Sequence, residues 1–217
     1  MNATLTKTLV EITSLKFAVL AITSVFIYYI IPPRLKVGYL VLLSCGFIAT
    51  FNIFLPFYLA SYAFINYLVG RKLPTTKHKT ALFRSGIILN LTQLVLLRYA
   101  SFAVDPILEL LGINIRASLL SEVIIPIGIS YYTLQGIGYL INVKMGWEKP
   151  ENSFLRFFLY LVFFPKFLSG PIERSNHFLP QLAINHKFNP SDISDGLRIA
   201  LQGFFKKVII ANHLGTA

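Results

Sequence analysis

Long apolar runs with almost no charge constrain this 217-residue chain more than any other feature. Residues 17–31, 37–51, 54–69 and 81–97 are four such runs, and residues 123–143 form a fifth without a single charged side chain. A helix needs about 20 apolar residues to cross the hydrocarbon core of a bilayer. Charged residues make up 13% of the chain, roughly half of the share that soluble domains carry. The sequence therefore predicts an all-α polytopic membrane protein with about five to six transmembrane helices.

The composition and the charge balance exclude several classes of protein. Cys45 is the only cysteine, so an intrachain disulfide and a cysteine-based zinc site are both excluded. The histidines lie far apart without a cluster of carboxylates, which predicts no metal site; they are His78, His177, His186 and His213. The net charge of +11 comes from cations in short loops beside apolar runs, where topology and lipid headgroups explain it. Nucleic acid is therefore not an expected partner.

The first apolar run has the start of a signal peptide, because Lys16 precedes a short apolar core. A cleavage site of small residues is missing, since Tyr28-Tyr29-Ile30-Ile31 leads directly into Pro32-Pro33. We therefore interpret residues 17–31 as an uncleaved span that uses its flanks to reach the required length.

Cations are distributed unequally between the loops, and this distribution predicts the orientation in the membrane. The loop after the first run contains Arg34 and Lys36, residues 52–53 contain no charge, and residues 71–84 contain five cations. The first and third of these loops lie on the same side if each run crosses the membrane once. The sequence thus predicts that the connector at 71–84 is cytoplasmic, whereas the N-terminus and residues 98–122 are outside.

The fifth apolar segment, residues 123–143, differs from the others because many small and polar residues interrupt it. These are Pro126, Gly128, Ser130, Thr133, Gln135, Gly136, Gly138 and Asn142. Lipid cannot satisfy such groups, so this helix must face other protein or a polar cavity. Two interpretations stay open: a packed interface between helices, or a substrate passage lined by Gln135 and its neighbours.

Residues 157–168 are apolar and aromatic but too few to span a bilayer. Pro165 breaks this run, Lys166 interrupts it, and Gly170-Pro171 ends it. Irregular backbone at membrane depth is tolerated only where protein buries it or where it lines a cavity. The sequence therefore predicts a re-entrant or interfacial broken helix.

The end of the chain carries the signature of an amphipathic helix. Asn189 is a good N-cap, Pro190 suits the first helical position, and Asp192 favours the positive end of the helix dipole. Apolar residues then recur at helical spacing up to the basic pair Lys206-Lys207, which suits a cytoplasmic membrane surface. No repeat or linker divides the sequence, which predicts one transmembrane domain over residues 1–217.

Three blocks of sequence occur in an order and spacing that resembles a known family. They are residues 125–135 (IPIGISYYTLQ), residues 163–172 (FFPKFLSGPI) with residues 178–181 (FLPQ) behind them, and residues 196–211. Together they resemble the membrane-bound O-acyltransferase (MBOAT) family, and its alginate O-acetylase-like bacterial branch in particular. Members of this family are longer than this chain and carry an essential histidine on a later helix. The resemblance therefore implies an N-terminal portion of such a fold, whose catalytic histidine and C-terminal half are expected beyond Ala217.

The resemblance implies an O-acyltransferase of the EC 2.3.1 type in the inner (cytoplasmic) cell membrane. Such an enzyme would transfer an acyl group, with acetyl the first expectation, to hydroxyls of an extracellular polysaccharide or cell-envelope polymer. The expected partners are the lipid bilayer, an acyl-donor protein or cofactor on the cytoplasmic side, the polysaccharide acceptor and the C-terminal half. No bound cofactor and no metal are expected, and this chain alone is expected to be inactive because it lacks the catalytic base.

The candidates for a substrate passage are Gln135, Ser130, Pro165, Lys166, Gly170 and Pro171. No residue of this chain is assigned a catalytic role. Two other functions stay open. A transporter also uses helices broken by glycine and proline, but the apolar runs contain no carboxylate. Their one arginine, Arg84, belongs to the basic connector at the start of the run 81–97, so no ion-coupling site is expected within the membrane. A non-catalytic membrane scaffold is the other alternative.

Overall fold

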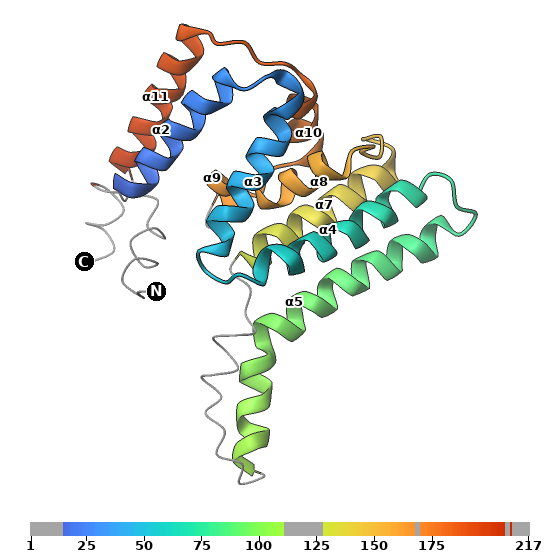
Figure 1. Cartoon of the computed structure of the whole chain (residues 1–217). Coiled ribbons are helices and arrows are strands. Elements are labelled where there is room, and N and C mark those ends of the chain that lie inside the picture. The colour runs from blue at the N-terminus through green and yellow to red at the C-terminus, as the bar shows by residue number, and fades with distance from the viewer. Residues whose placement is uncertain (1–14, 111–127, 168–169, 207–208, 210–217) are drawn as a thin grey trace. The chain divides into compact units, whose positions relative to one another are not determined.

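The computed structural model describes residues 15–110, 128–167, 170–206 and 209, and every element in these residues is helical. The elements are α2 (Leu15–Ile30), the 3-10 turn η1 (Pro33–Leu35), α3 (Lys36–Ala49), α4 (Leu55–Lys72), α5 (Lys79–Leu110), α7 (Ile129–Met145), α8 (Phe154–Val162), α9 (Phe164–Phe167), α10 (Ser175–Ala183) and α11 (Pro190–Phe205) (Figure 1). These elements confirm the prediction of an all-α fold for the described residues. The chain forms two compact units, residues 33–184 and residues 1–32 with 185–217, and each is considered by itself. The single transmembrane domain over residues 1–217 stays a prediction.

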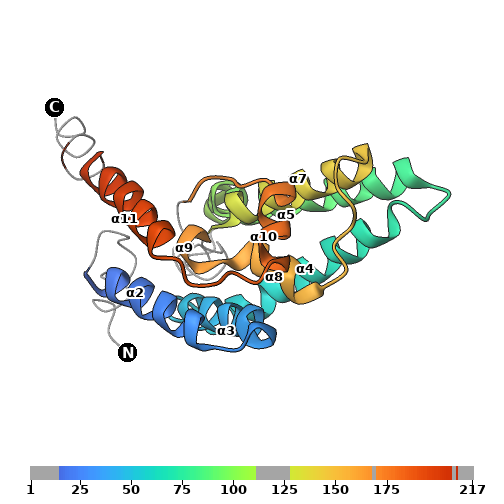
Figure 2. The ribbon, with the colours of Figure 1, turned by 90° about the horizontal axis from the view of Figure 1, so that it is seen from above.

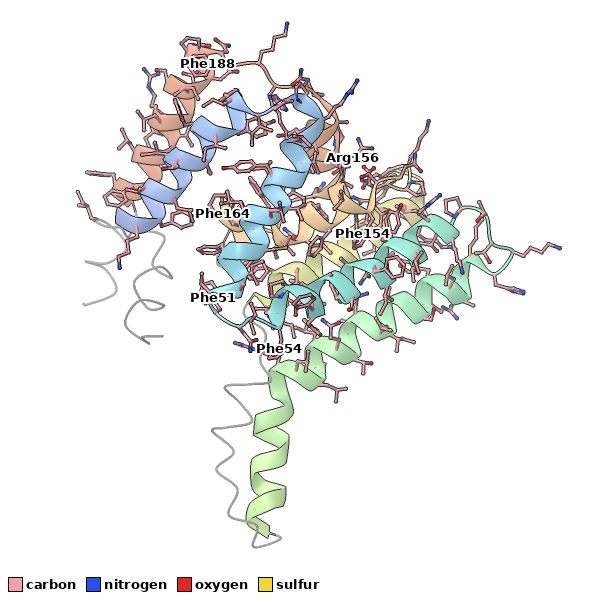
Figure 3. The ribbon with its side chains drawn as sticks, in the orientation of Figure 1. Phe51, Phe54, Phe154, Arg156, Phe164 and Phe188 are labelled. Atoms are coloured by element: carbon pink, nitrogen blue, oxygen red, sulfur yellow. The ribbon has the colours of Figure 1, made fainter. Side chains whose placement is uncertain are left out.

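The short helix α8 lies at the centre of the larger unit. It packs against α3, α4, α7 and α10, and residues 157–162 are all buried (Figures 1 and 2). Six buried residues in succession leave no exposed face over that stretch, as is typical of a helix enclosed by protein. Aromatic rings anchor its start, because Phe154 packs edge-on against Phe64 and Tyr67 of α4 with ring centroids 5.7 Å apart in both pairs (Figure 3).

Helices α4 and α5 form an antiparallel hairpin, and α7 packs against both (Figure 1). The described part of the chain contains one helical segment, Lys79–Arg98, that is long and apolar enough to cross a membrane, and Lys16–Ile30 is a shorter apolar helix. The first segment agrees with the predicted span at 81–97, although α5 itself continues to Leu110. Residues 123–127 of the predicted fifth span lie outside the described residues, and α7 begins at Ile129.

A network of neutral polar side chains joins α4, α5 and α7. The Tyr62 hydroxyl donates to the amide oxygen of Asn90, and the Asn90 amide nitrogen donates to Asn66 Oδ1 at 2.8 Å. Asn66 in turn donates to the Tyr62 carbonyl at 3.1 Å, and all three side chains are buried. Helix α7 lies close to this network at Gly136. A Cβ at that position would lie 2.5 Å from the Tyr62 hydroxyl oxygen, so the close approach requires glycine. Hydrogen bonds of this kind hold helices together where the hydrophobic effect between them is weak.

The smaller unit contains α2 and α11. The rings of Tyr29, at the end of α2, and Phe188, just before α11, meet edge-on with centroids 5.3 Å apart. Asn189 caps α11 as predicted, since its side-chain oxygen accepts from the Ser191 backbone N–H at 3.2 Å. The predicted helix therefore forms at residues 190–205, while Lys207 lies outside the described residues.

Replacing Asn90 with leucine tests the network between the helices. The Asn90→Leu change removes the amide that bonds Tyr62, Asn66 and the Gly86 carbonyl, and it leaves buried polar groups without partners. We expect a loss of about 2 kcal/mol in the free energy of unfolding, measured by thermal unfolding in detergent. The control is Thr92→Val, which removes a hydroxyl from an exposed position of the same helix and should change stability by less than about 0.5 kcal/mol. Equal effects of the two changes would show that the network does not stabilise the bundle.

Candidate functional site

The broken helix predicted at residues 157–168 is present, and its break lies at Phe163. Helix α8 ends at Val162, Phe163 adopts φ −54° and ψ 112°, and α9 begins at Phe164. Pro165 explains why one continuous helix cannot form, because its ring lacks an N–H and would clash with the carbonyl of Leu161. The chain leaves the helical conformation two residues before the proline, and Pro165 itself is exposed in the first turn of α9.

The break leaves a backbone N–H without an acceptor in its own helix, and the Ser44 hydroxyl of α3 accepts a hydrogen bond from it. The Phe164 N–H donates to Ser44 Oγ at 3.1 Å, and the serine side chain is completely buried. The ring of Phe164 (labelled in Figure 3) also packs against Phe47 of α3, with the two ring centroids 5.9 Å apart. Ser44 did not emerge from the sequence as a site residue; the available signal was a polar side chain inside the apolar run 37–51. It satisfies the irregular backbone in an apolar environment.

Lys166 is held by one carboxylate and two aromatic rings. Its Nζ lies 3.3 Å from Glu173 Oε2, 3.6 Å from the ring centroid of Phe178 and 4.7 Å from that of Tyr160. The side chain is buried, as an ammonium group can be only when it is paired. The chain folds back over it, because the Gly170 N–H donates to the Lys166 carbonyl and a Cβ at Gly170 would lie 2.5 Å from the Lys166 Cβ. Glycine is therefore required at this turn.

A pocket of about 340 Å³ lies between the stretch of α7 from Leu134 to Asn142, Tyr160 of α8, and the segment that leads into α10. Gln135 is the one predicted passage residue among those lining it, and the Gln135 carbonyl accepts from the Tyr160 hydroxyl at 3.3 Å. The same hydroxyl donates to the Glu173 carbonyl at 2.9 Å, and Lys166 pairs with the Glu173 side chain. Tyr160 and Glu173 thus link two of the predicted passage residues: Gln135 contacts Tyr160, and Lys166 contacts Glu173. The lining does not include Ser130, Pro165, Gly170 or Pro171.

A second polar cluster closes the pocket near the end of α7. The Ser175 hydroxyl donates to Glu148 Oε2 at 2.5 Å, and the Asn142 amide nitrogen lies 3.1 Å from Ser175 Oγ and 3.4 Å from the same carboxylate. Burial raises the pKa of the Glu148 carboxyl above its ordinary value, although the two hydrogen bonds oppose this shift. The cluster fixes the end of α7 against the start of α10.

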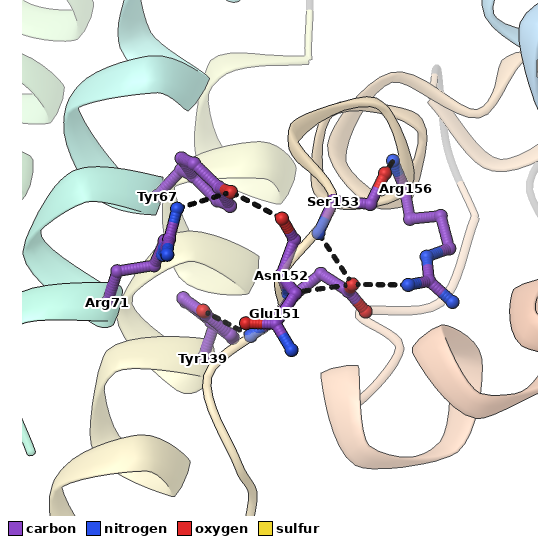
Figure 4. A network of polar contacts seen from close by, with 7 residues as sticks. All are labelled: Tyr67, Arg71, Tyr139, Glu151, Asn152, Ser153 and Arg156. Atoms are coloured by element: carbon purple, nitrogen blue, oxygen red, sulfur yellow. Dashed lines mark hydrogen bonds and ion pairs between the residues drawn. The ribbon is translucent and has the colours of Figure 1, made fainter.

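The loop between α7 and α8 is fixed by a network around Glu151 (Figure 4). Glu151 Oε1 accepts from the backbone N–H groups of Asn152 and Ser153 and pairs with Arg156 at 3.0 Å. The Tyr139 hydroxyl accepts from the Glu151 N–H at 3.1 Å. These bonds tie the loop to the last turns of α7 and to the start of α8.

The same loop reaches the ends of α4 and α5. The Tyr67 hydroxyl donates to the Asn152 carbonyl at 2.6 Å and accepts from Arg71 at 3.4 Å (Figure 4). Lys144 donates to the Thr80 hydroxyl at 3.3 Å. The end of α4, the start of α5 and the end of α7 therefore lie together. The predicted topology requires this arrangement, because it places all three on one side of the membrane.

Histidines do not gather at this site. His78, His177 and His186 are exposed, and His213 lies outside the described residues. No group of three or more His, Cys, Asp or Glu side chains that could hold a metal ion occurs within the part of the chain that the structure describes. The roles assigned to the six passage candidates stay predictions.

Comparison with known proteins gives a consistent result for most of the chain. It is 28% identical over 194 residues to the probable alginate O-acetylase AlgI of Pseudomonas aeruginosa, covering 87% of this chain and 37% of that protein. It is 31% identical over 205 residues to the peptidoglycan O-acetyltransferase of Helicobacter pylori, covering 81% of this chain and 38% of that protein. The teichoic acid D-alanyltransferase of Bacillus subtilis is 29% identical over 92 residues, or 42% of this chain and 23% of the relative. The chain spans less than half of the length of these relatives.

No family model matches the chain, and no solved structure matches it. The fold and the site define an all-helical protein with an apolar candidate span and a broken helix enclosed in its core. The relatives support an MBOAT-like family for this chain, which confirms the resemblance seen in the three sequence blocks.

Removing the Ser44 hydroxyl tests how the broken helix is stabilised. In Ser44→Ala the buried N–H of Phe164 loses its acceptor, so we expect a loss of about 1–3 kcal/mol in the free energy of unfolding. Thermal unfolding in detergent measures it. The matched control is Ser61→Ala on α4, where an exposed hydroxyl donates to the Phe57 carbonyl of its own helix. If both variants unfold like the unmodified protein, Ser44 is not what satisfies the break.

Proposed function

We propose that this chain is part of a membrane-bound O-acyltransferase that transfers an acetyl group to hydroxyls of an extracellular polysaccharide or cell-envelope polymer. One observation carries the proposal: 87% of the chain aligns with an alginate O-acetylase and 81% with a peptidoglycan O-acetyltransferase. Alginate and peptidoglycan are both polymers with sugar hydroxyls, so the shared chemistry is ester formation on a sugar oxygen. The acyl donor, acetyl or another acyl group on a carrier, would approach from the cytoplasmic side.

The protein would lie in the cytoplasmic membrane with about five to six spans. The grouping of the end of α4, the start of α5 and the end of α7 supports this proposal, because it brings cations to one end of the helices. The exposed cations there are Arg71, Lys72, Lys77 and Lys79. Such an excess is typical of the cytoplasmic side of a membrane protein.

The described residues would form walls of the reaction chamber and would not supply its base. An unassisted sugar hydroxyl is a poor nucleophile at neutral pH, and general-base assistance contributes ~10²–10⁴-fold to such a transfer. The histidine that the family resemblance implies would take that role. The polar helix α7 with Gln135 and the break between α8 and α9 would shape the place where donor and acceptor meet. The enclosed position of α8 and the Ser44 bond to the break support this division of roles.

The activity is tested with the protein in full, as its gene encodes it. Ester-linked acetate on the purified envelope polymers is measured in cells with and without the gene, and in cells carrying Gly170→Leu. We expect the acetate to disappear without the gene and to fall by about 10²-fold in Gly170→Leu, because a side chain there displaces the backbone at Lys166. Gly196→Leu is the control, since nothing lies near a Cβ at that position. An unchanged acetate content without the gene would favour the scaffold or transporter alternatives.

The orientation is tested by labelling single cysteines in a Cys45→Ser background. Lys77→Cys, in the basic connector, should resist a membrane-impermeant thiol reagent in intact cells and react after permeabilisation. Asn52→Cys, in the charge-free loop after α3, should react in intact cells. Labelling of position 77 from the outside would overturn the proposed topology.

A further inference from the structure

The pocket beside α7 carries one charge of each sign. Glu173 and Arg174 are the charged residues among those lining it, and they are neighbours in the chain. Glu173 pairs through Oε2 with Lys166, while about a third of its side chain is still accessible. Arg174 is exposed, and its guanidinium forms no hydrogen bond or ion pair within the described part of the chain. The pocket therefore offers a cation and a carboxylate side by side to a ligand.

The rim of the pocket is apolar and exposed. Leu134 and Ile141 of α7, Ile172 and Trp147 line it, and their exposed fractions run from 37% to 66%. In a protein that lies in a membrane, exposed apolar side chains contact lipid chains, and tryptophan prefers the level of the headgroups. An apolar rim around a charged floor fits a molecule with a polar head and a hydrocarbon chain.

We propose that this pocket binds one zwitterionic phospholipid whose headgroup carries a primary ammonium. The phosphate would bind Arg174, the ammonium would bind the Glu173 carboxylate, and an acyl chain would lie along Leu134 and Ile141. This proposal rests on the proposed membrane location. The site is outside the reaction described above, in which the pocket lining contributes only Gln135.

Charge complementarity selects this headgroup over others. Arg174 and Glu173 are neighbours in the lining, and Lys166 pairs with only one oxygen of Glu173, so a cation and a carboxylate oxygen are available to a phosphate and an ammonium on one molecule. An anionic headgroup without an amine would place a second negative charge beside Glu173 and would offer no donor to its oxygen Oε1, since Lys166 pairs with Oε2. A choline headgroup has no N–H, so it cannot donate a charge-assisted hydrogen bond to a carboxylate.

Native mass spectrometry of the protein in full, purified in mild detergent, tests the proposal. Phosphatidylethanolamine, phosphatidylglycerol and phosphatidylcholine with identical chains are added in turn, and the occupancy of one lipid is compared. We expect phosphatidylethanolamine to bind about ten-fold more tightly than the others and to lose this preference in Arg174→Gln and Glu173→Gln. The control is Lys149→Gln, which removes an exposed cation from the neighbouring loop outside the pocket lining. Equal binding of the three lipids, or equal loss in Lys149→Gln, would overturn the proposal.

A second measurement locates the lipid. Phosphatidylethanolamine with brominated chains should quench tryptophan fluorescence, and the quenched part should vanish in Trp147→Phe. Quenching that persists in Trp147→Phe would place the lipid elsewhere and overturn the assignment. If soluble glycerophosphoethanolamine, which has no acyl chains, displaces the lipid at equal concentration, the proposed contact of an acyl chain with the pocket is overturned. Neither readout depends on acetyl transfer, so an inactive protein that still binds the lipid would contradict only the proposed function.

Discussion

The bond from the Phe164 N–H to Ser44 is the contact on which the centre of the larger unit depends. An N–H group without a partner is costly in apolar surroundings, and a helix that breaks there must find an acceptor elsewhere in the protein. α3 supplies it with one serine hydroxyl, so the chain can leave the helix at Phe163 and still stay buried. The position of Lys166 follows from this, because Lys166 on α9 then lies where Glu173 and two rings can enclose its ammonium group.

The same constraint explains how a polar helix can lie in the core. Helix α7 carries amides, hydroxyls and glycines, and each needs a partner or a close neighbour. On one face Gly136 lets Tyr62 approach, and Tyr62 is held by Asn90 and Asn66. On another face the Gln135 carbonyl accepts from Tyr160. Gly136 and the Gln135 carbonyl thus serve helix packing, the buried hydroxyls of Tyr132 and Thr133 form no hydrogen bond within the described residues, and the pocket extends along α7 to Asn142.

The sequence predicted the elements well and their pairings poorly. Apolar runs placed α2, α4 and the first part of α5, and helical spacing with the Asn189 cap placed α11, because these signals are local. Proline and glycine spacing predicted the broken helix for the same reason. The partners that make the site could not be read from the sequence, since Ser44 and Phe164 are 120 residues apart and Asn142 and Ser175 are 33 apart. The passage role of Lys166 stays a prediction, and its ion pair with Glu173 could not be read from the sequence because it depends on three-dimensional contacts alone.

The length of α8 limits what it can do in a membrane. Its nine residues rise about 14 Å, roughly half of the ~30 Å hydrocarbon core, and residues on every side of its central part are buried. Such a helix cannot separate the two sides of a bilayer by itself, and the surrounding helices must do so. In the proposed acyl transfer this geometry is useful, because a donor and an acceptor that enter from opposite faces would meet at the level where α8 ends. The satisfied break at Phe163 would then keep the backbone at that level fixed while the polar groups of α7 stay in place beside it.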